Sequence, residues 1–127
     1  PTRRSSDLTL CTLYDYALRL GMHPLVEVNT AEEMARALVL SPRVIGVNNR
    51  NLHTFDVDMS TTSQLAHAGI ERGTLLAALS GITGRADVEA YEAQGVRAVL
   101  VGEALVTGAG DVASNVRAMR VPLGVRR

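Results

Sequence analysis

Four short apolar runs recur along this sequence, at residues 25–28, 44–47, 75–79 and 98–101, and a segment with helical spacing follows each of them. Unbroken apolar runs of this length are typical of strands that are buried on both faces, as in parallel sheets, whereas antiparallel strands usually alternate in polarity. Because helices separate the runs, we expect crossover connections between the strands. Such connections join parallel strands, and they are almost always right-handed. The sequence therefore predicts an α/β fold of parallel β/α repeats.

Local signals mark where the helices between these runs begin. Thr30 and Glu33 form a capping-box pattern, in which the hydroxyl and the carboxylate each bind a free backbone N–H, and Ser60 or Thr61 is the expected cap of the third helix. One helix followed by four strand–helix units suits half of a (β/α)₈ barrel, which needs about 250 residues in full, or part of an open doubly wound sheet. The expected helices cover residues 9–20, 30–38, 56–68, 87–94 and 111–119.

The composition argues against several classes of partner and location. Thirteen basic and thirteen acidic side chains cancel, so no net charge attracts nucleic acid or an anionic membrane. No apolar run approaches the roughly 20 residues of a membrane span. The only cysteine, Cys11, has no partner for an internal disulfide, which is typical of the reducing cytoplasm. Three histidines far apart, with no companion cysteine, predict no metal site.

The first eight residues differ from the rest of the chain. They are mostly charged and polar and no apolar segment follows them, so they are not a secretory signal. They also join no periodic pattern. We expect residues 1–8 to be a tag, a junction or another non-native segment, and the half-barrel to occupy residues 9–127.

Polar residues stand where the first two strands are expected to end, and chemistry in parallel α/β folds gathers at such ends. Glu27 interrupts the first apolar run, where a carboxylate is costly to bury without a partner. It is either a general acid or base in a partly desolvated pocket or one half of a structural ion pair. The second run leads into Asn-Asn-Arg-Asn at residues 48–51, whose groups suit a phosphate or carboxylate, although Asn also favours turns. The density of polar groups at this strand end favours a binding loop.

Glycine follows each of the last two apolar runs. Ser80 and Gly81 come after the third run, and Gly102 and Glu103 come after the fourth. Glycine allows backbone N–H groups to approach an anion closely, and a short helix starting at Glu103 would add the positive end of its dipole. Phosphate sites of (β/α)₈ barrels are typically built from the loops after the last two strands. We therefore expect a phosphate site at these two turns, at the same mouth as Glu27.

Together these residues resemble the indole-3-glycerol phosphate synthase family. The most specific piece is Gly-Val-Asn-Asn-Arg-Asn-Leu at residues 46–52, whereas Val-Gly-Glu-Ala-Leu at residues 101–105 is common among related phosphate-binding barrels. The resemblance covers about residues 9–119, and it implies that the four strands are strands 5–8 of a TIM (β/α)₈ barrel. The matching segments are residues 20–22, 25–28, 45–52, 54–55, 80–82 and 98–105.

The resemblance also implies a reaction and a role for each site residue. The family closes the ring of 1-(2-carboxyphenylamino)-1-deoxyribulose 5-phosphate, with loss of CO₂ and water, and it uses no cofactor or metal. Glu27 matches a catalytic carboxylate that transfers protons, Asn48 a residue that hydrogen-bonds the substrate's hydroxyls, and Ser80 the phosphate-side loop. The matching substrate-binding residues are Arg50 near the anthranilate end, Gly81, Gly102 and Glu103 at the phosphate, and Leu52 and Leu100 as apolar walls.

Two departures from the family pattern bear on activity. The family usually has Glu just before Ser-Gly-Ile, where this chain has Leu79, and this change would remove a proton relay. The family's catalytic lysines, including its general acid, and another glutamate lie in the first half of the barrel, and this sequence contains no lysine. General acid–base catalysis is typically worth about 10²–10⁴ in rate. We therefore expect a truncated synthase without turnover of its own.

Two other hypotheses remain open. The first is another barrel enzyme that acts on a sugar phosphate, but this class does not account for the loop at residues 48–52. The second is a non-catalytic half-barrel that associates with itself, because a four-strand piece leaves the edges of its first and last strands unpaired. A small-molecule sugar phosphate is the expected partner in the enzymatic hypotheses.

Overall fold

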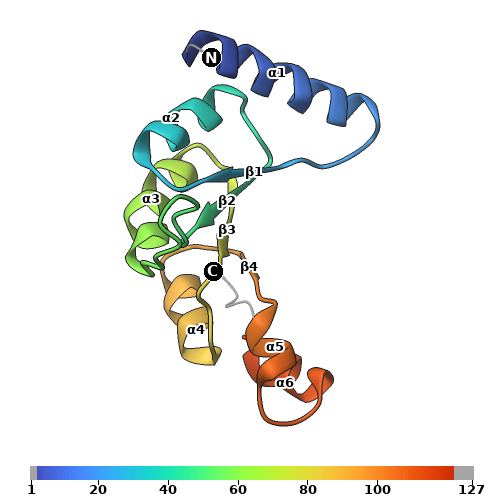
Figure 1. Ribbon diagram of the computed structural model, residues 1–127, viewed down its shortest axis with the longest axis vertical. Helices are drawn as coiled ribbons and strands as arrows, with labels where there is room; N and C mark the ends of the chain where they lie inside the picture. Colours follow the sequence, from blue (N-terminus) through green and yellow to red (C-terminus); the bar gives the residue numbers. More distant parts are fainter. Residues whose placement is uncertain (1–2, 122–127) are drawn as a thin grey trace.

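The computed structural model describes residues 3–121, with side chains from Ser6 onward. It contains one parallel sheet with the strand order β1-β2-β3-β4 (Figure 1), which confirms the expected α/β class and parallel pairing. Residues 1–2, in the segment expected to be non-native, and residues 122–127, at the end of the expected half-barrel, lie outside the described residues. The strands are β1 (Leu25–Val28), β2 (Val44–Asn48), β3 (Leu75–Leu79) and β4 (Ala98–Leu100).

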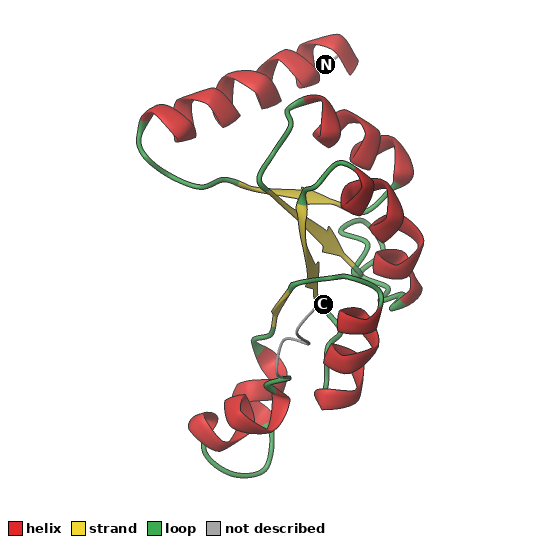
Figure 2. Ribbon diagram, turned by 180° about the vertical axis from the view of Figure 1, so that it is seen from behind, coloured by secondary structure: helices red, strands yellow, loops and turns green. Residues whose placement is uncertain are grey.

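Helices connect the strands and cover one face of the sheet. Figure 2 shows α2, α3 and α4 side by side on that face, whereas the opposite face is open. Helix α1 lies beyond β1 at one end of the molecule, and α5 and α6 follow β4 at the other end (Figure 1). None of the helices in residues 3–121 is long and apolar enough to cross a membrane. The helices are α1 (Arg3–Arg19), α2 (Ala31–Val39), α3 (Ser60–Glu71), α4 (Arg85–Ala93), α5 (Glu103–Thr107) and α6 (Val112–Met119).

The hydrophobic core lies between the sheet and these three helices. Val26, Ile45 and Leu76 share one row of the register and are almost fully buried. Burying each such side chain stabilises the fold by about 1.5–3 kcal/mol. The neighbouring row faces the other way, and its members Leu25 and Leu75 are 47% and 40% exposed. The expectation of burial on both faces therefore holds in part. In β2 and β3 every residue after the first is buried, whereas the edge strands β1 and β4 keep exposed residues, because no described helix covers the face opposite α2, α3 and α4 (the inner face).

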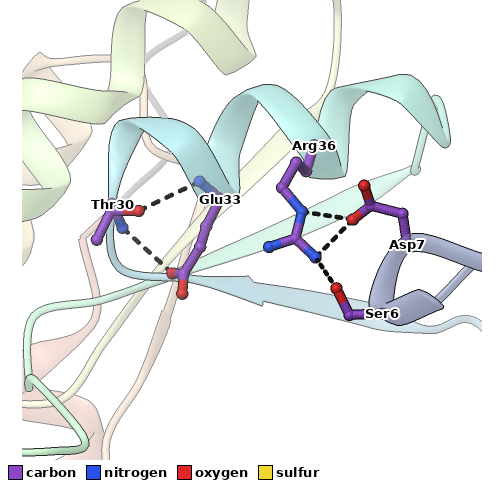
Figure 3. Close-up of polar contacts among 5 residues, drawn as sticks. All are labelled: Ser6, Asp7, Thr30, Glu33 and Arg36. Atoms are coloured by element: carbon purple, nitrogen blue, oxygen red, sulfur yellow. Dashed lines mark hydrogen bonds and ion pairs between the residues drawn. The ribbon is translucent and has the colours of Figure 1, made fainter. Parts of the chain in front are cut away.

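Helix α2 begins with the expected capping box. The Thr30 hydroxyl accepts the Glu33 N–H at 3.2 Å, and the Glu33 carboxylate accepts the Thr30 N–H at 3.3 Å (Figure 3). The same carboxylate also accepts the Asn29 N–H at 2.7 Å. These bonds occupy backbone donors that have no partner inside the helix. The box fixes the point at which the chain leaving β1 turns back over the sheet.

Helix α3 begins differently from the expectation. Its N-cap is Met59, whose side chain makes no capping bond, so the expected cap at Ser60 or Thr61 is wrong. The carboxylate of Asp58 instead accepts the Ser60 N–H at 2.9 Å. Hydrogen bonds from the Ser60 side chain and backbone lower the pKa of Asp58. A charged acceptor close to the free N–H groups of a helix start is favourable, which explains why the preceding aspartate takes this role.

Helix α1 begins at Arg3 and not at residue 9, so the expected start was wrong. Arg36 of α2 contacts its first turns, pairing with Asp7 at 2.6 Å and donating to the Ser6 hydroxyl at 3.1 Å (Figure 3). Both ionic side chains are partly exposed, so this pair orients α1 more than it stabilises it. Tyr14 is the side chain by which α1 joins the buried core among the described residues. That residues 1–8 are non-native stays a prediction.

Replacing Thr30 with Ala should lower the free energy of unfolding by about 1 kcal/mol, because the substitution removes the acceptor of the capping box. The measurement is urea unfolding, read as a shift in midpoint at constant slope. Thr12→Ala is the matched control, since the exposed Thr12 hydroxyl donates to Leu8 O within α1 and makes no other hydrogen bond among the described residues. This control should be neutral or slightly stabilising. An equal loss in both variants would contradict the role given to the box.

Candidate active site

The carboxyl ends of all four strands border one open cleft of about 800 Å³. Its walls come from the strand ends, from the turns after β3 and β4, and from α5. Parallel pairing brings these segments together, although they lie far apart in the sequence. Eight of the nine candidate residues line the cleft: Glu27, Asn48, Arg50, Ser80, Gly81, Leu100, Gly102 and Glu103.

Leu52 is the candidate that does not reach the cleft. It lies in the loop between β2 and α3 and is 60% exposed. This loop folds on itself, because the Asn51 side-chain oxygen accepts the N–H groups of His53 at 2.8 Å and Thr54 at 3.3 Å. The apolar wall expected at Leu52 is therefore missing from the cleft of this chain.

Asn48 orients the carboxylate of Glu27. The Asn48 Nδ2 donates to Glu27 Oε1 at 2.8 Å, and its Oδ1 accepts the Arg50 N–H at 2.9 Å. Asn29 Nδ2 donates to the Asn48 backbone carbonyl at 2.7 Å, which adds a third fixed contact. Because both ends of the Asn48 amide have partners, its nitrogen faces the carboxylate and its oxygen faces the loop after β2.

The surroundings of Glu27 differ from both expectations. Its side chain is exposed, so no desolvated pocket encloses it, and it has no ion pair within residues 3–121. The reason is its place on the inner face of edge strand β1, which the described elements leave open to water. The carboxylate is held by Asn48 alone among the described hydrogen bonds of its side chain.

Leu79 forms an apolar floor beside this carboxylate. It is 4% exposed and stands in register with Asn48. A Cβ atom placed on Gly46 would lie 2.6 Å from Leu79 Cδ1, so the leucine side chain lies across Gly46. Gly46 is itself the register partner of Glu27. Where the family pattern has a second carboxylate, this cleft therefore has a hydrocarbon surface next to the first.

A buried polar network supports the turn after β3. Asn49 is 1% exposed, and its Nδ2 donates to Ser80 O and to the Tyr91 hydroxyl, both at 3.0 Å. Its Oδ1 accepts the Thr62 N–H at 3.2 Å and the Thr62 hydroxyl at 2.8 Å. The Tyr91 hydroxyl donates to Met59 O at 2.8 Å. The amide thus fills all four of its hydrogen-bonding positions, so its burial leaves no unpaired group.

Burial raises the pKa of Tyr91, and the Asn49 hydrogen bond opposes this shift. The phenol therefore stays protonated at neutral pH and remains a donor to Met59. The turn that the network supports has unusual backbone angles, with φ of 65° at Ser80 and 77° at Gly81. A serine in this left-handed region costs about 1–2 kcal/mol, and only well-packed surroundings hold it there.

Several residues of the cleft were not anticipated. Thr83 and Thr107 line it, but the Thr83 hydroxyl donates to Asp87 and the Thr107 hydroxyl donates to Glu103 O. The Thr83 N–H is the main cause of the lowered pKa of Asp87. Three further lining residues, Ile82, Val101 and Ala104, lie in the segments that resemble the family but were given no role, and Gly108 was not anticipated. In residues 3–121, no group of three or more His, Cys, Asp or Glu side chains is placed to hold a metal ion.

Comparison with known proteins identifies relatives of this chain. Residues 4–119 match the family model described as indole-3-glycerol phosphate synthase. The chain is 62% identical, over 101 residues, to a multifunctional tryptophan biosynthesis protein of Phycomyces blakesleeanus. The aligned region covers 80% of this chain and 13% of the relative. It is 40% identical, over 111 residues, to an indole-3-glycerol phosphate synthase of Oceanobacillus iheyensis, covering 87% of this chain and 42% of that relative. The chain thus spans less than half the length of these relatives.

The family match and the four parallel strands lead to the same assignment. The matched segment runs from α1 to the end of α6 and includes every strand of the sheet. This chain belongs to the indole-3-glycerol phosphate synthase family, and its β/α units are part of that family's TIM barrel.

Proposed function

We propose that this chain supplies the phosphate-binding and proton-transfer side of an indole-3-glycerol phosphate synthase. The supporting observation is the single cleft that Glu27, Asn48, Ser80 and Gly102 share. In the complete protein, the substrate is 1-(2-carboxyphenylamino)-1-deoxyribulose 5-phosphate. Ring closure forms a carbon–carbon bond, and CO₂ and water leave. We also propose a cytoplasmic location for this activity, which the single cysteine of the given sequence suits.

The two glycine-containing turns are the proposed phosphate side of the cleft. Ser80 and Gly81 follow β3, and Gly102 and Glu103 lie where β4 gives way to α5. Nothing lies within 4 Å of a Cβ built on Gly102, so an anion can approach the backbone there. Backbone N–H groups are effective partners for phosphate because they are fixed dipoles with no rotamers to order.

The other end of the cleft receives the aromatic part of the substrate. Arg50 is the cationic side chain among the lining residues, and its guanidinium can hold a carboxylate with two parallel bonds. Asn48 lies between Arg50 and Glu27 and is placed to bond the sugar hydroxyls. Glu27 then accepts or returns a proton during the loss of water. Leu100 supplies an apolar wall on the β4 side.

The isolated 127-residue chain should produce no indole-3-glycerol phosphate, because it contains no lysine to act as general acid. Loss of general acid catalysis lowers the rate by about 10²–10⁴, and the missing walls leave the substrate unoriented. The measurement is product fluorescence from the purified chain and substrate, against a blank without protein. Fluorescence above that blank would show that the chain holds a complete catalytic set.

Inorganic phosphate or glycerol phosphate should bind weakly to the chain and shift the amide NMR signals of Ser80, Gly81, Gly102 and Glu103. Gly81→Ala should weaken this binding about ten-fold or more, the effect of losing one hydrogen bond to a charged group. The added Cβ would meet Met59 Sδ and Val57 Cγ1 at 2.6 Å, which forces the turn to move.

The matched control for this substitution is Gly73→Ala. Gly73 also has a positive φ, of 73°, but nothing lies within 4 Å of its Cβ position and it does not line the cleft. Both variants should lose stability through backbone strain, whereas only the change at Gly81 should alter phosphate affinity. Unchanged amide signals in the parent chain, or equal affinities for the two variants, would refute the assigned site.

A further inference from the structure

We propose that Tyr91 and Asn49 are positioning residues for the phosphate-side turn formed by Ser80 and Gly81. The inference rests on the proposed function, because it states how the phosphate site of that function is held in shape. Neither Tyr91 nor Asn49 lines the cleft, and both are at least 97% buried. They act from beneath the turn, through its backbone.

Asn49 fixes the direction of two successive peptide groups. Its backbone N–H donates to Leu79 O at 2.9 Å, and its side-chain Nδ2 donates to Ser80 O at 3.0 Å. A trans peptide group is planar, and its N–H points opposite to its C=O. With both carbonyls directed at Asn49, the N–H groups of Ser80 and Gly81 point away from it. One asparagine therefore sets the orientation of the donors that a phosphate would meet.

Tyr91 holds Asn49 and the underside of Gly81 at the same time. Its hydroxyl accepts from Asn49 Nδ2 at 3.0 Å and donates to Met59 O at 2.8 Å. The Met59 side chain lies directly under Gly81, since a Cβ on Gly81 would be 2.6 Å from Met59 Sδ. The Tyr91 hydroxyl oxygen thus connects helix α4 to Asn49 and to Met59, the two residues that support the turn.

Thr62 completes the network from helix α3. Its N–H and its hydroxyl both donate to Asn49 Oδ1, at 3.2 Å and 2.8 Å. These bonds prevent the amide from rotating by half a turn, which would direct its oxygen at the Ser80 carbonyl. The orientation of the turn thus depends on side chains from helix α3, helix α4 and the loop after β2.

The experiment compares Tyr91→Phe with Tyr14→Phe in the full 127-residue chain. Each substitution removes one phenolic oxygen from a buried ring, but the Tyr14 hydroxyl makes none of the hydrogen bonds found among the described residues. Without phosphate, Tyr91→Phe should shift the amide signals of Ser80 and Gly81 and lower their heteronuclear NOE values. Tyr14→Phe should leave both signals unchanged.

Titration with inorganic phosphate gives the second readout. Tyr91→Phe should raise the dissociation constant about three- to ten-fold, as expected when a neutral hydrogen bond that orients the donors is lost. Both variants are compared at a temperature at which they are fully folded, so a purely structural role would leave this constant unchanged. Tyr14→Phe should bind phosphate like the parent chain.

A pair of substitutions at Thr62 tests the same network independently. Thr62→Val removes the hydroxyl donor to Asn49 and should reproduce the Tyr91→Phe changes at Ser80 and Gly81. Thr62→Ser keeps that donor and should restore the parent signals. If Tyr91→Phe does not fold, this pair decides the question.

The failure of the inference and the failure of the proposed function give different results. A parent chain that binds no phosphate would refute the phosphate site, while the phosphate-free spectra would still report whether Tyr91 sets the turn. Signals of Ser80 and Gly81 that are unchanged in Tyr91→Phe would overturn the inference, whatever the parent chain binds. Thr62→Val spectra that match those of Thr62→Ser would overturn it as well.

Discussion

The parallel register of the four strands is the constraint on which every part of the site depends. Asn48, Leu79 and Leu100 form one row of that register at the cleft end of the sheet. Side chains alternate between the two faces of a strand, so a slip by one residue exchanges the faces. The effect would be largest at the end of β2, where Asn48 faces the cleft and the next residue, Asn49, is buried beneath it. Asn48 and Asn49 thus have the same side chain but opposite roles, because neighbouring residues of a strand face opposite sides of the sheet.

The sequence was sufficient where a structural signal is local. The strand runs and the capping box at Thr30 were predicted because their causes lie within a few residues of each other. The prediction that Leu52 lines the cleft was wrong, because the turn that directs the loop away from the cleft depends on the Asn51 side chain and not on the apolar pattern. The partnership of Asn49 with Tyr91 joins residues 42 positions apart, and no periodic signal reports such a contact. The rule that chemistry gathers at the carboxyl ends of parallel strands predicted where the site lies, but long-range side-chain contacts determine its geometry.

Leu79 and Glu27 show how the chemistry of this half of the site depends on what covers it. The leucine is buried across Gly46, whereas the carboxylate beside it is exposed. An apolar neighbour strengthens the interactions of a carboxylate only when water is excluded. On an open inner face the hydrocarbon of Leu79 therefore has little influence on Glu27. Covering that face would bring the carboxylate, its Asn48 donor and the leucine into one water-poor space.

The helices at the two edges of the sheet limit what can cover that face. Helix α1 precedes β1 and α6 follows β4, and a groove of about 360 Å³ separates α1 from β1. Within the sheet, a single helix joins each pair of neighbouring strands. A second copy related by two-fold symmetry would pair its β4 with β1 and bring its α6 to the seam that α1 already flanks. Each seam would then hold α1 of one copy with α5 and α6 of the other, whereas a single helix joins every other pair of neighbouring strands. Unpaired strand edges favour the addition of further strands, so β1 and β4 are the edges at which a covering element has to join the sheet, and the helices beside these edges limit how closely it can approach.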